Sequence, residues 1–420
     1  MSTYNDKNKD PSQKYYNILV KNNNTGYDNN GNPVPYTSAV DLSFEQTRTI
    51  PYINHPRDFY MSVVGFEMDT QSVPVFICDP IVGQSNVNDT VYTITMNYIT
   101  SSGTGNKVVQ RRVQWEPEDK SATIPTGKVP DNYNMDPYYY AYTYQHFIGL
   151  VNKTLDTCWN ALQALPAPQL PITANTLEAF ISLEGDKVIL NAQNALCLTD
   201  SSGNIINNDG SVKVSGIKIY FNTELYNLFS SLEAIKVVQP LDNIGPTSSF
   251  LNTNYQMLFT INQSSIFNEL TPTSFGAVPP TLTYGMMQNI SEYSPLPYWN
   301  PIDKVVFTTA QLPVVPQLVA AASNYYTNAQ NSSTNADVSY ILCDFSAQLA
   351  TGTEYKPNIT YIPPAEYVLN ELYGDIPLSS ISIFVFWKDK FGDLHPFLLE
   401  AGGTALLKIM FRKKDFYLDT

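Results

Sequence analysis

The fold class is decided by a stretch close to the end of the sequence, Ser380-Ile381-Ser382-Ile383-Phe384-Val385-Phe386-Trp387. Successive side chains of a β-strand point to opposite faces of the sheet. If this stretch is a strand, one of its faces is wholly apolar and carries Ile381, Ile383, Val385 and Trp387. The other face begins with serine and ends with phenylalanine. The alternation predicts a β-strand with one face in a core.

Two further runs follow this strand. A charged turn at residues 388–393 leads into residues 394–399, and Gly402-Gly403 separates these from residues 404–412. The last run alternates in the same way, with one apolar face made by Ala405, Leu407, Ile409 and Phe411. Turn residues between alternating runs are typical of antiparallel hairpins. The sequence therefore predicts a three-stranded meander, which needs another layer to pack on.

The same stretch resembles the C-terminal segment of the minor capsid (penton) proteins of virophages and polinton-like viruses, with Trp387-Lys388-Asp389-Lys390-Phe391-Gly392 at its centre. Other blocks between about residue 42 and residue 413 are similar to the same family, in the same order and at similar spacing. They are Pro56-Arg57-Asp58-Phe59-Tyr60 with residues 72–76, residues 219–229, and Pro295-Leu296-Pro297-Tyr298-Trp299 with residues 305–314.

The resemblance implies a structural virion protein. It implies a jelly-roll β-sandwich that forms a homopentamer at the fivefold vertices of an icosahedral capsid and contacts the major capsid protein of the same virus. Synthesis would take place in the host cytoplasm or a virus factory. Two alternatives stay open: a major capsid protein built of two jelly rolls, for which the chain is short, and a carbohydrate-binding jelly roll, which would need a secretion route.

Composition independently favours a β-rich protein of more than one domain. A chain of 420 residues with 43% hydrophobic and 13% aromatic residues can bury a large core and is too long for one ordinary domain. Tyrosine and proline are abundant, at 29 residues each, whereas charged residues make up only 15%. These values are typical of a rigid all-β protein rather than a helical enzyme.

The predicted architecture is mainly β: a single jelly-roll sandwich with an inserted smaller β-rich domain, short helices and one long amphipathic helix. Residues 1–34 are polar and are expected to be a flexible N-terminal arm, in which residues 15–20 could add a strand to a neighbour. Residues 35–165 and 296–420 would form a discontinuous jelly-roll domain, because neither block alone supplies eight strands. Residues 166–295 would be the insertion, after a proline-rich connector.

Two helices are predicted from local signals. The long helix is expected over residues 140–165, where apolar residues recur at steps of three and four: Tyr144, Ile148, Val151, Leu155, Cys158, Leu162 and Leu165. Pro166 stops it. A short helix is expected at residues 223–235, with Asn222 as its N-cap. The best strand, residues 91–98, would turn Tyr92, Ile94, Met96 and Tyr98 inward.

Charge limits the partners. The formal net charge of −14 argues against direct nucleic-acid binding, which depends on Lys and Arg. The one cationic cluster is near the C-terminal end: Lys408, Arg412, Lys413 and Lys414. It is either a solvated strand end or a contact with an acidic capsid partner. We expect no membrane span, because no run of about 18 apolar residues occurs.

The sequence offers no pattern for catalysis or metal binding, and we expect no enzyme activity, cofactor, catalytic residue or metal site. There are only three histidines, and His146 is expected to be a core or interface residue. The acidic run Glu116-Pro117-Glu118-Asp119 is either a solvated loop or a set of carboxylates for glycoside hydrolysis or calcium. The four cysteines lack zinc-site spacing and are expected to be buried free thiols: Cys78, Cys158, Cys197 and Cys343.

Overall fold

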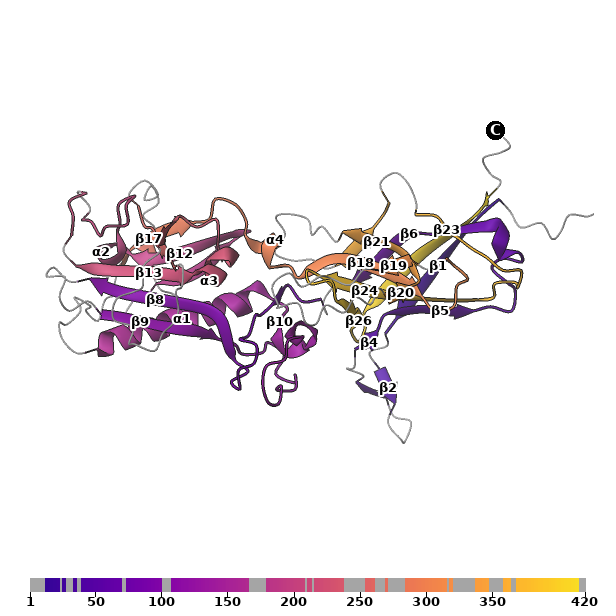
Figure 1. The fold of residues 1–420 in the computed structure, drawn as a ribbon, viewed down its shortest axis with the longest axis horizontal. Coiled ribbons are helices and arrows are strands. Elements are labelled where there is room, and N and C mark those ends of the chain that lie inside the picture. Colours follow the sequence, from indigo (N-terminus) through magenta and orange to yellow (C-terminus); the bar gives the residue numbers. More distant parts are fainter. Residues whose placement is uncertain are drawn as a thin grey trace, which may run out of the picture. The chain divides into compact units, whose positions relative to one another are not determined.

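The chain folds into two compact units (Figure 1). Unit 1 comprises residues 1–73, 301–349 and 355–420, and unit 2 comprises residues 74–300 and 350–354. The structure is a computed structural model. It describes residues 12–22, 25–27, 33–35, 39–69, 73–99, 107–165, 179–207, 210–213, 215–237, 254–260, 269–270, 284–315, 317–319, 337–346, 358–363 and 368–414.

Unit 1 is a sandwich of two antiparallel sheets. The first, called the β27 sheet, has the order β1 (Gln13–Lys21), β27 (Thr404–Lys413), β6 (Phe59–Asp69) and β22 (Asn358–Tyr361), and β23 (Asn370–Glu371) also pairs with β6. The second, called the β24 sheet, has the order β21 (Ile341–Ser346), β18 (Ile302–Thr309), β24 (Ser380–Asp389) and β25 (Leu394–Pro396), and β5 (Ser43–Thr47) also pairs with β24. Short pairs complete the unit: β4 (Val40–Asp41) with β26 (Leu398–Leu399), β2 (Thr25–Tyr27) with β3 (Pro33–Pro35), and β19 (Gln317–Val319) with β20 (Asp337–Ser339).

Aromatic side chains join the two sheets of unit 1. Phe66 of the β27 sheet meets Phe307 of the β24 sheet edge to face, with ring centroids 5.0 Å apart. It also meets Phe44 of β5, at 6.3 Å. All three rings are buried, and edge-to-face pairs at such distances are favourable beyond the area they bury. The apolar faces predicted for β24 and β27 both lie in the core. The prediction of a mainly β, jelly-roll protein is confirmed.

The predicted C-terminal meander is wrong in its pairing. β24 does pair with β25, from Phe386 opposite Pro396 to Lys388 opposite Leu394. β27, however, pairs with β6 and β1 in the other sheet. Each of the two long strands has a single apolar face, and both faces are buried when the strands lie in opposite layers of one sandwich. Turn residues mark where a strand ends and leave its partner undetermined.

The flexible-arm prediction for residues 1–34 is wrong for the part that the structure describes between residues 12 and 22. β1 pairs with β27 along its whole length, from Gln13 opposite Arg412 to Lys21 opposite Thr404. The strand has an apolar inner side, on which Ile18 is buried. That burial offsets the entropy of ordering a polar segment. Residues 1–11 lie outside the described residues.

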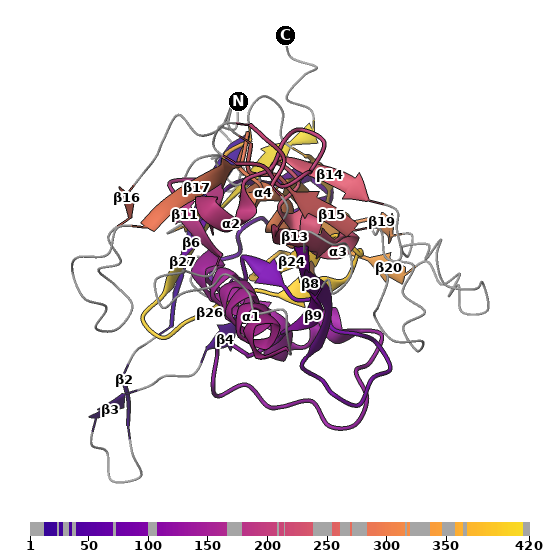
Figure 2. The same cartoon turned by 90° about the vertical axis from the view of Figure 1, so that its left-hand side faces the viewer.

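Unit 2 contains two sheets and the long helix. One sheet has the order β14 (Ala234–Val237), β15 (Asn254–Met257), β13 (Gly216–Asn222), β8 (Asp89–Ile99) and β9 (Lys107–Gln114). The other has the order β11 (Phe180–Glu184), β12 (Lys187–Gln193), β17 (Tyr284–Ile290) and β16 (Glu269–Leu270). Helix α1 (Tyr144–Ala164) contacts β8, β9 and β11, and Figure 2 shows it close to end-on. The short elements are α2 (Asn194–Cys197), α3 (Thr223–Leu228), α4 (Leu296–Trp299), the pair β7 (Phe76–Ile77) and β10 (Tyr140–Ala141), and the 3-10 turns η2 (Tyr133–Met135) and η3 (Pro137–Tyr139), with η1 (Pro56–Asp58) in unit 1.

Helix α1 confirms the predicted helix with a later start. The predicted apolar stripe from Tyr144 to Leu162 is buried. The helix begins at Tyr144, because Thr143 accepts a hydrogen bond from the backbone N–H of His146 as its N-cap. At the other end, the buried Lys107 donates from Nζ to the carbonyl of Leu165 at 2.9 Å. A cation at this end also complements the helix dipole.

The predicted domain boundaries differ from the observed units. The sequence predicts that residues 74–165 belong to the jelly-roll domain, but they lie in unit 2. The reason is that β8 pairs with β13, and its apolar face packs in the same core as α1. Unit 2 is consequently the larger unit, not a small insertion. The helix expected at residues 223–235 ends at Leu228, although Asn222 is its N-cap and accepts from the N–H of Leu225 at 3.2 Å.

Candidate capsid-contact site

The four cations proposed as a contact site lie from the middle of β27 to just beyond its end, on different sides of the sheet. Lys408 is exposed, and its ammonium lies 5.3 Å from the centre of the Tyr15 ring. Arg412 is half-buried on the same face of the strand. At about 3.3 Å per residue, four residues separate the two by roughly 13 Å. Lys408 and Arg412 are therefore neighbours on one face without being in contact.

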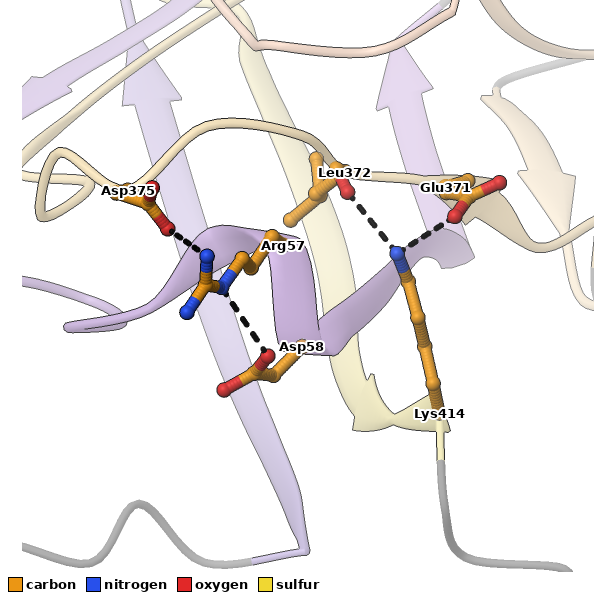
Figure 3. A network of polar contacts seen from close by, with 6 residues as sticks. All are labelled: Arg57, Asp58, Glu371, Leu372, Asp375 and Lys414. Carbon is orange, nitrogen blue, oxygen red and sulfur yellow. Dashed lines mark hydrogen bonds and ion pairs between the residues drawn. The ribbon is translucent and has the colours of Figure 1, made fainter.

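Lys413 and Lys414 are held by unit 1 itself. Lys414 donates from Nζ to Oε1 of Glu371 at 2.7 Å and to the carbonyl of Leu372 at 3.1 Å (Figure 3). Its ammonium also lies 5.6 Å from the ring of Tyr60, and that of Lys413 lies 6.0 Å from the ring of Phe59. The structure does not gather the four charges into one site. Lys414 is an anchor for the end of β27.

A second ion pair beside this anchor was not predicted. Arg57 of η1 lies with Nη1 2.9 Å from Oδ1 of Asp375, and with Nε 3.8 Å from Oδ1 of Asp58 (Figure 3). All three side chains are largely exposed, so each pair contributes only about 0–1 kcal/mol. Arg57 and Asp375 are far apart in sequence, and no local pattern could have joined them. Together with Lys414, they tie the segment after β23 to η1 and β27.

The outer face of the β27 sheet carries exposed apolar side chains next to Lys408. Leu19 is 68% exposed and lies directly opposite Leu406, which is 36% exposed. Tyr15 is 49% exposed. We call this the outer patch and define it as Tyr15, Asn17, Leu19, Leu406 and Lys408. Apolar residues bordered by a cation are complementary to a partner surface that is apolar and carries carboxylates.

The acidic run after β9 serves local structure. Glu118 accepts hydrogen bonds from the N–H of Tyr142 at 2.6 Å, from the N–H of Thr143 at 3.1 Å and from the Thr143 hydroxyl at 2.8 Å. Glu116 forms an ion pair with Lys153 of α1, and Asp119 accepts from Ser121. The carboxylates thus support the start of α1 and the turn that precedes it. In the described residues, no group of three or more His, Cys, Asp or Glu side chains could hold a metal ion.

Removal of the Lys153 ammonium tests the ion pair. The hydrogen bond from Lys153 lowers the pKa of Glu116 below its usual 4.5. A carboxyl group with a lowered pKa contributes stability above its unfolded pKa and loses it as the pH falls through the folded pKa. We expect Lys153→Ala to return the pKa of Glu116 towards 4.5, and to cost at most about 1 kcal/mol at neutral pH because both side chains are exposed. An NMR titration of the carboxyl carbons measures it, and an unchanged Glu116 pKa in the variant would contradict the assignment.

The four cysteines and His146 are packing residues. All four cysteines are buried and free. Burial raises the pKa of Cys158, Cys197 and Cys343 to about 12 and that of Cys78 well above its usual value, so the thiols are protonated at neutral pH. The ring of His146 lies edge-on to Trp115 at 5.5 Å, and its Nε2 lies 2.6 Å from the carbonyl oxygen of Glu116.

His395, for which the sequence predicts no catalytic role, is buried beside a carboxylate. Its Nε2 lies 3.0 Å from Oδ2 of Asp389, and its ring stacks on Trp387 with centroids 3.8 Å apart. Oδ1 of Asp389 accepts from the N–H groups of Phe391 and Asp393, each at 2.9 Å. The arrangement fixes the turn between β24 and β25.

No helix in the described part of the chain is long and apolar enough to cross a membrane.

The two-sheet jelly roll is a fold that viral capsid proteins share with lectins and other proteins, so the fold alone does not decide the class. The chain belongs to the family described as Sputnik minor capsid protein V18/19, because a model of that family matches residues 14–413. The resemblance to minor capsid proteins inferred from the sequence is thereby confirmed. Membership of a minor capsid family decides against the alternative of a major capsid protein.

Individual relatives agree with this assignment. The uncharacterized protein V18 of Sputnik virophage is 30% identical over 163 residues, which are 37% of this chain and 87% of the relative. Structural protein V19 of Sputnik virophage is 22% identical over 199 residues, which are 47% of this chain and 82% of the relative. Each of these relatives matches less than half of the present chain.

Two solved structures share the fold. A chain in the cryo-EM structure of the Sputnik virophage matches with a TM-score of 0.70 at 22% identity, over 98% of this chain and 100% of that one. The crystal structure of the mavirus penton protein matches with a TM-score of 0.56 at 13% identity, over 96% of this chain and 100% of that one. At these identities the likeness establishes the fold.

Proposed function

We propose that five copies of this minor capsid protein close a ring at the fivefold vertices of an icosahedral capsid. The observation that carries the proposal is the match of 96% of the chain to the fold of a penton protein. A jelly roll presents loops at its ends and sheet faces at its sides. Different surfaces of one copy can therefore contact the next copy, and such heterologous contacts close into a ring when the rotation allows it.

We assign contact with the major capsid protein of the same virus to the outer patch together with Arg412. Lys408 is an exposed cation of this region, and Leu19 and Leu406 supply apolar area beside it. Lys413 and Lys414 take part indirectly, by fixing the end of β27. The formal charge of −14 argues against a direct role in nucleic-acid binding. The protein acts in this proposal as a shell component without catalytic activity, made in the host cytoplasm or a virus factory.

We expect added salt to favour ring formation rather than to weaken it. Five copies carry a formal charge of 5 × −14 = −70, and like charges within a Debye length of about 8 Å repel one another. Burial of apolar surface at the contacts opposes this repulsion. Several hundred Å² at about 25 cal/mol per Å² gives a gross free-energy gain on the order of 10 kcal/mol per contact, from which the entropy of association must be subtracted. The purified protein should be monomeric or weakly pentameric at low salt.

Sedimentation velocity across salt and pH tests this balance. The fraction of pentamer should rise with added salt, divalent cations or mild acid, because each of them reduces repulsion between carboxylates. Addition of the major capsid protein should raise it further. A dimer under every condition, or a ring that dissociates as salt rises, would contradict the proposal.

A further inference from the structure

Strand β1 occupies an edge position from which it can leave without breaking the rest of the sandwich. Among the described strands it pairs only with β27, through nine opposed residue pairs. β27 is also paired with β6 on its other side. A chain without β1 in place would therefore keep the β27–β6 ladder and would present a free strand edge, which is a template for pairing with another chain.

Specific side-chain contacts hold both ends of β1 in its position beside β27. The hydroxyl of Tyr16 and the ammonium of Lys14 both donate to the carbonyl of Tyr52, at 3.2 Å and 3.0 Å, and the rings of Tyr16 and Tyr52 meet edge-on at 4.8 Å. At the far end, Asn22 donates from Nδ2 to the carbonyl of Leu399 at 2.8 Å and from its N–H to the carbonyl of Gly403 at 3.1 Å. Any copy of β1 would find the same partners in any copy of the sandwich.

The connection that follows β1 is much longer than its ends require. Asn22 is hydrogen-bonded to Leu399, and Val40 of β4 pairs with the same Leu399. The two ends of the connection thus lie beside one residue, although residues 23–39 run between them. Part of this connection is the β2–β3 hairpin, which Figure 1 shows standing off from the sheets of unit 1. With the hairpin intact the remaining residues could extend to roughly 20 Å, and without it to about 56 Å.

We infer that β1 is exchanged between neighbouring copies in the assembled ring, so that the β1 of one copy pairs with the β27 of the next. The inference rests on the proposed ring. Exchange of an identical element keeps every contact of the strand and is a low-cost route to association. Each exchanged strand would also link two copies through a complete strand interface, which opposes the repulsion between copies with a formal charge of −14 each.

Paired cysteines on the outer face distinguish exchange from pairing within one chain. Asn17 and Lys408 are both exposed and lie directly opposite each other in the register. Directly opposed residues of an antiparallel pair have Cβ atoms about 4.5–5.5 Å apart, close enough for a disulfide after small adjustments. The test variant is Asn17→Cys/Lys408→Cys. The matched control is Glu67→Cys/Leu406→Cys, an exposed opposed pair on β6 and β27. The native cysteines are buried and free.

Rings are first formed at high salt, then oxidised, and finally analysed on denaturing gels without reductant. The test variant should give a ladder of covalent oligomers up to the pentamer, whereas the control variant should remain at the monomer position with its thiols consumed. If the test variant forms an intact ring but runs as a monomer on the gel, whether linked within the chain or not linked at all, the exchange would be contradicted. The proposed ring would not be. A protein that forms no ring under any condition would overturn both.

Discussion

Phe66→Ala is expected to lower the free energy of unfolding of unit 1 by about 3–5 kcal/mol, the range typical of a buried phenylalanine replaced by alanine. Phe66 is 2% exposed and is the ring through which β6 meets Phe44 and Phe307 of the facing sheet. Its loss removes two edge-to-face contacts and leaves a cavity at the centre of the sandwich. Protein interiors are close-packed and relax only partly around such a cavity.

Hydrogen exchange at the amides of β24 and β27 during urea denaturation reports on unit 1 separately from unit 2. Phe391→Ala is the matched control, because Phe391 is 56% exposed at the turn after β24. It should change the unfolding free energy of unit 1 by no more than about 0.5 kcal/mol. Equal effects of the two variants would contradict the assignment of Phe66 to the core between the sheets.

Asp389→Ala is expected to destabilise unit 1 by about 3–5 kcal/mol, since it leaves buried polar groups without a partner. The carboxylate of Asp389 accepts from the N–H groups of Phe391 and Asp393 and lies beside Nε2 of His395. Its side chain is 1% exposed and that of His395 is 3% exposed. Water cannot replace the lost oxygen atoms without opening the turn. Asp389→Asn, which keeps one acceptor oxygen, should cost less.

Asp344→Ala provides the control for Asp389→Ala. Asp344 forms an ion pair with Lys304 at 2.7 Å, but both side chains are more than 40% exposed. The loss of such a pair costs about 0–1 kcal/mol. The same exchange measurement applies to both variants. If Asp389→Ala were no more harmful than Asp344→Ala, the turn between β24 and β25 would not depend on its buried carboxylate.

Local patterns in the sequence predicted local structure well. Alternation placed the apolar face of β24 in the core, and the three-and-four spacing located α1 and its buried stripe. The N-cap role of Asn222 followed from its position before a helical segment. Each of these features depends on neighbours within a few residues, so the sequence around it is sufficient.

Partners distant in the sequence could not be predicted in the same way. The place of β27 in the opposite sheet, the pairing of β8 with β13 and the order in residues 12–22 all depend on which apolar faces meet. The ion pairs between distant residues could not be predicted either. Neither the Arg57–Asp375 pair nor the Lys414–Glu371 pair has a local signature in the sequence. The arrangement of the candidate contact residues could not be predicted either, since adjacent cations fall on different faces of one strand.

The most direct test of the account is an image reconstruction of a particle that contains this protein. The jelly-roll fold and the family assignment lead us to expect density for five copies around each fivefold vertex, with the outer patch against the major capsid protein. A reconstruction with the chain at other lattice positions, or with vertices built by a different protein, would contradict the proposed function.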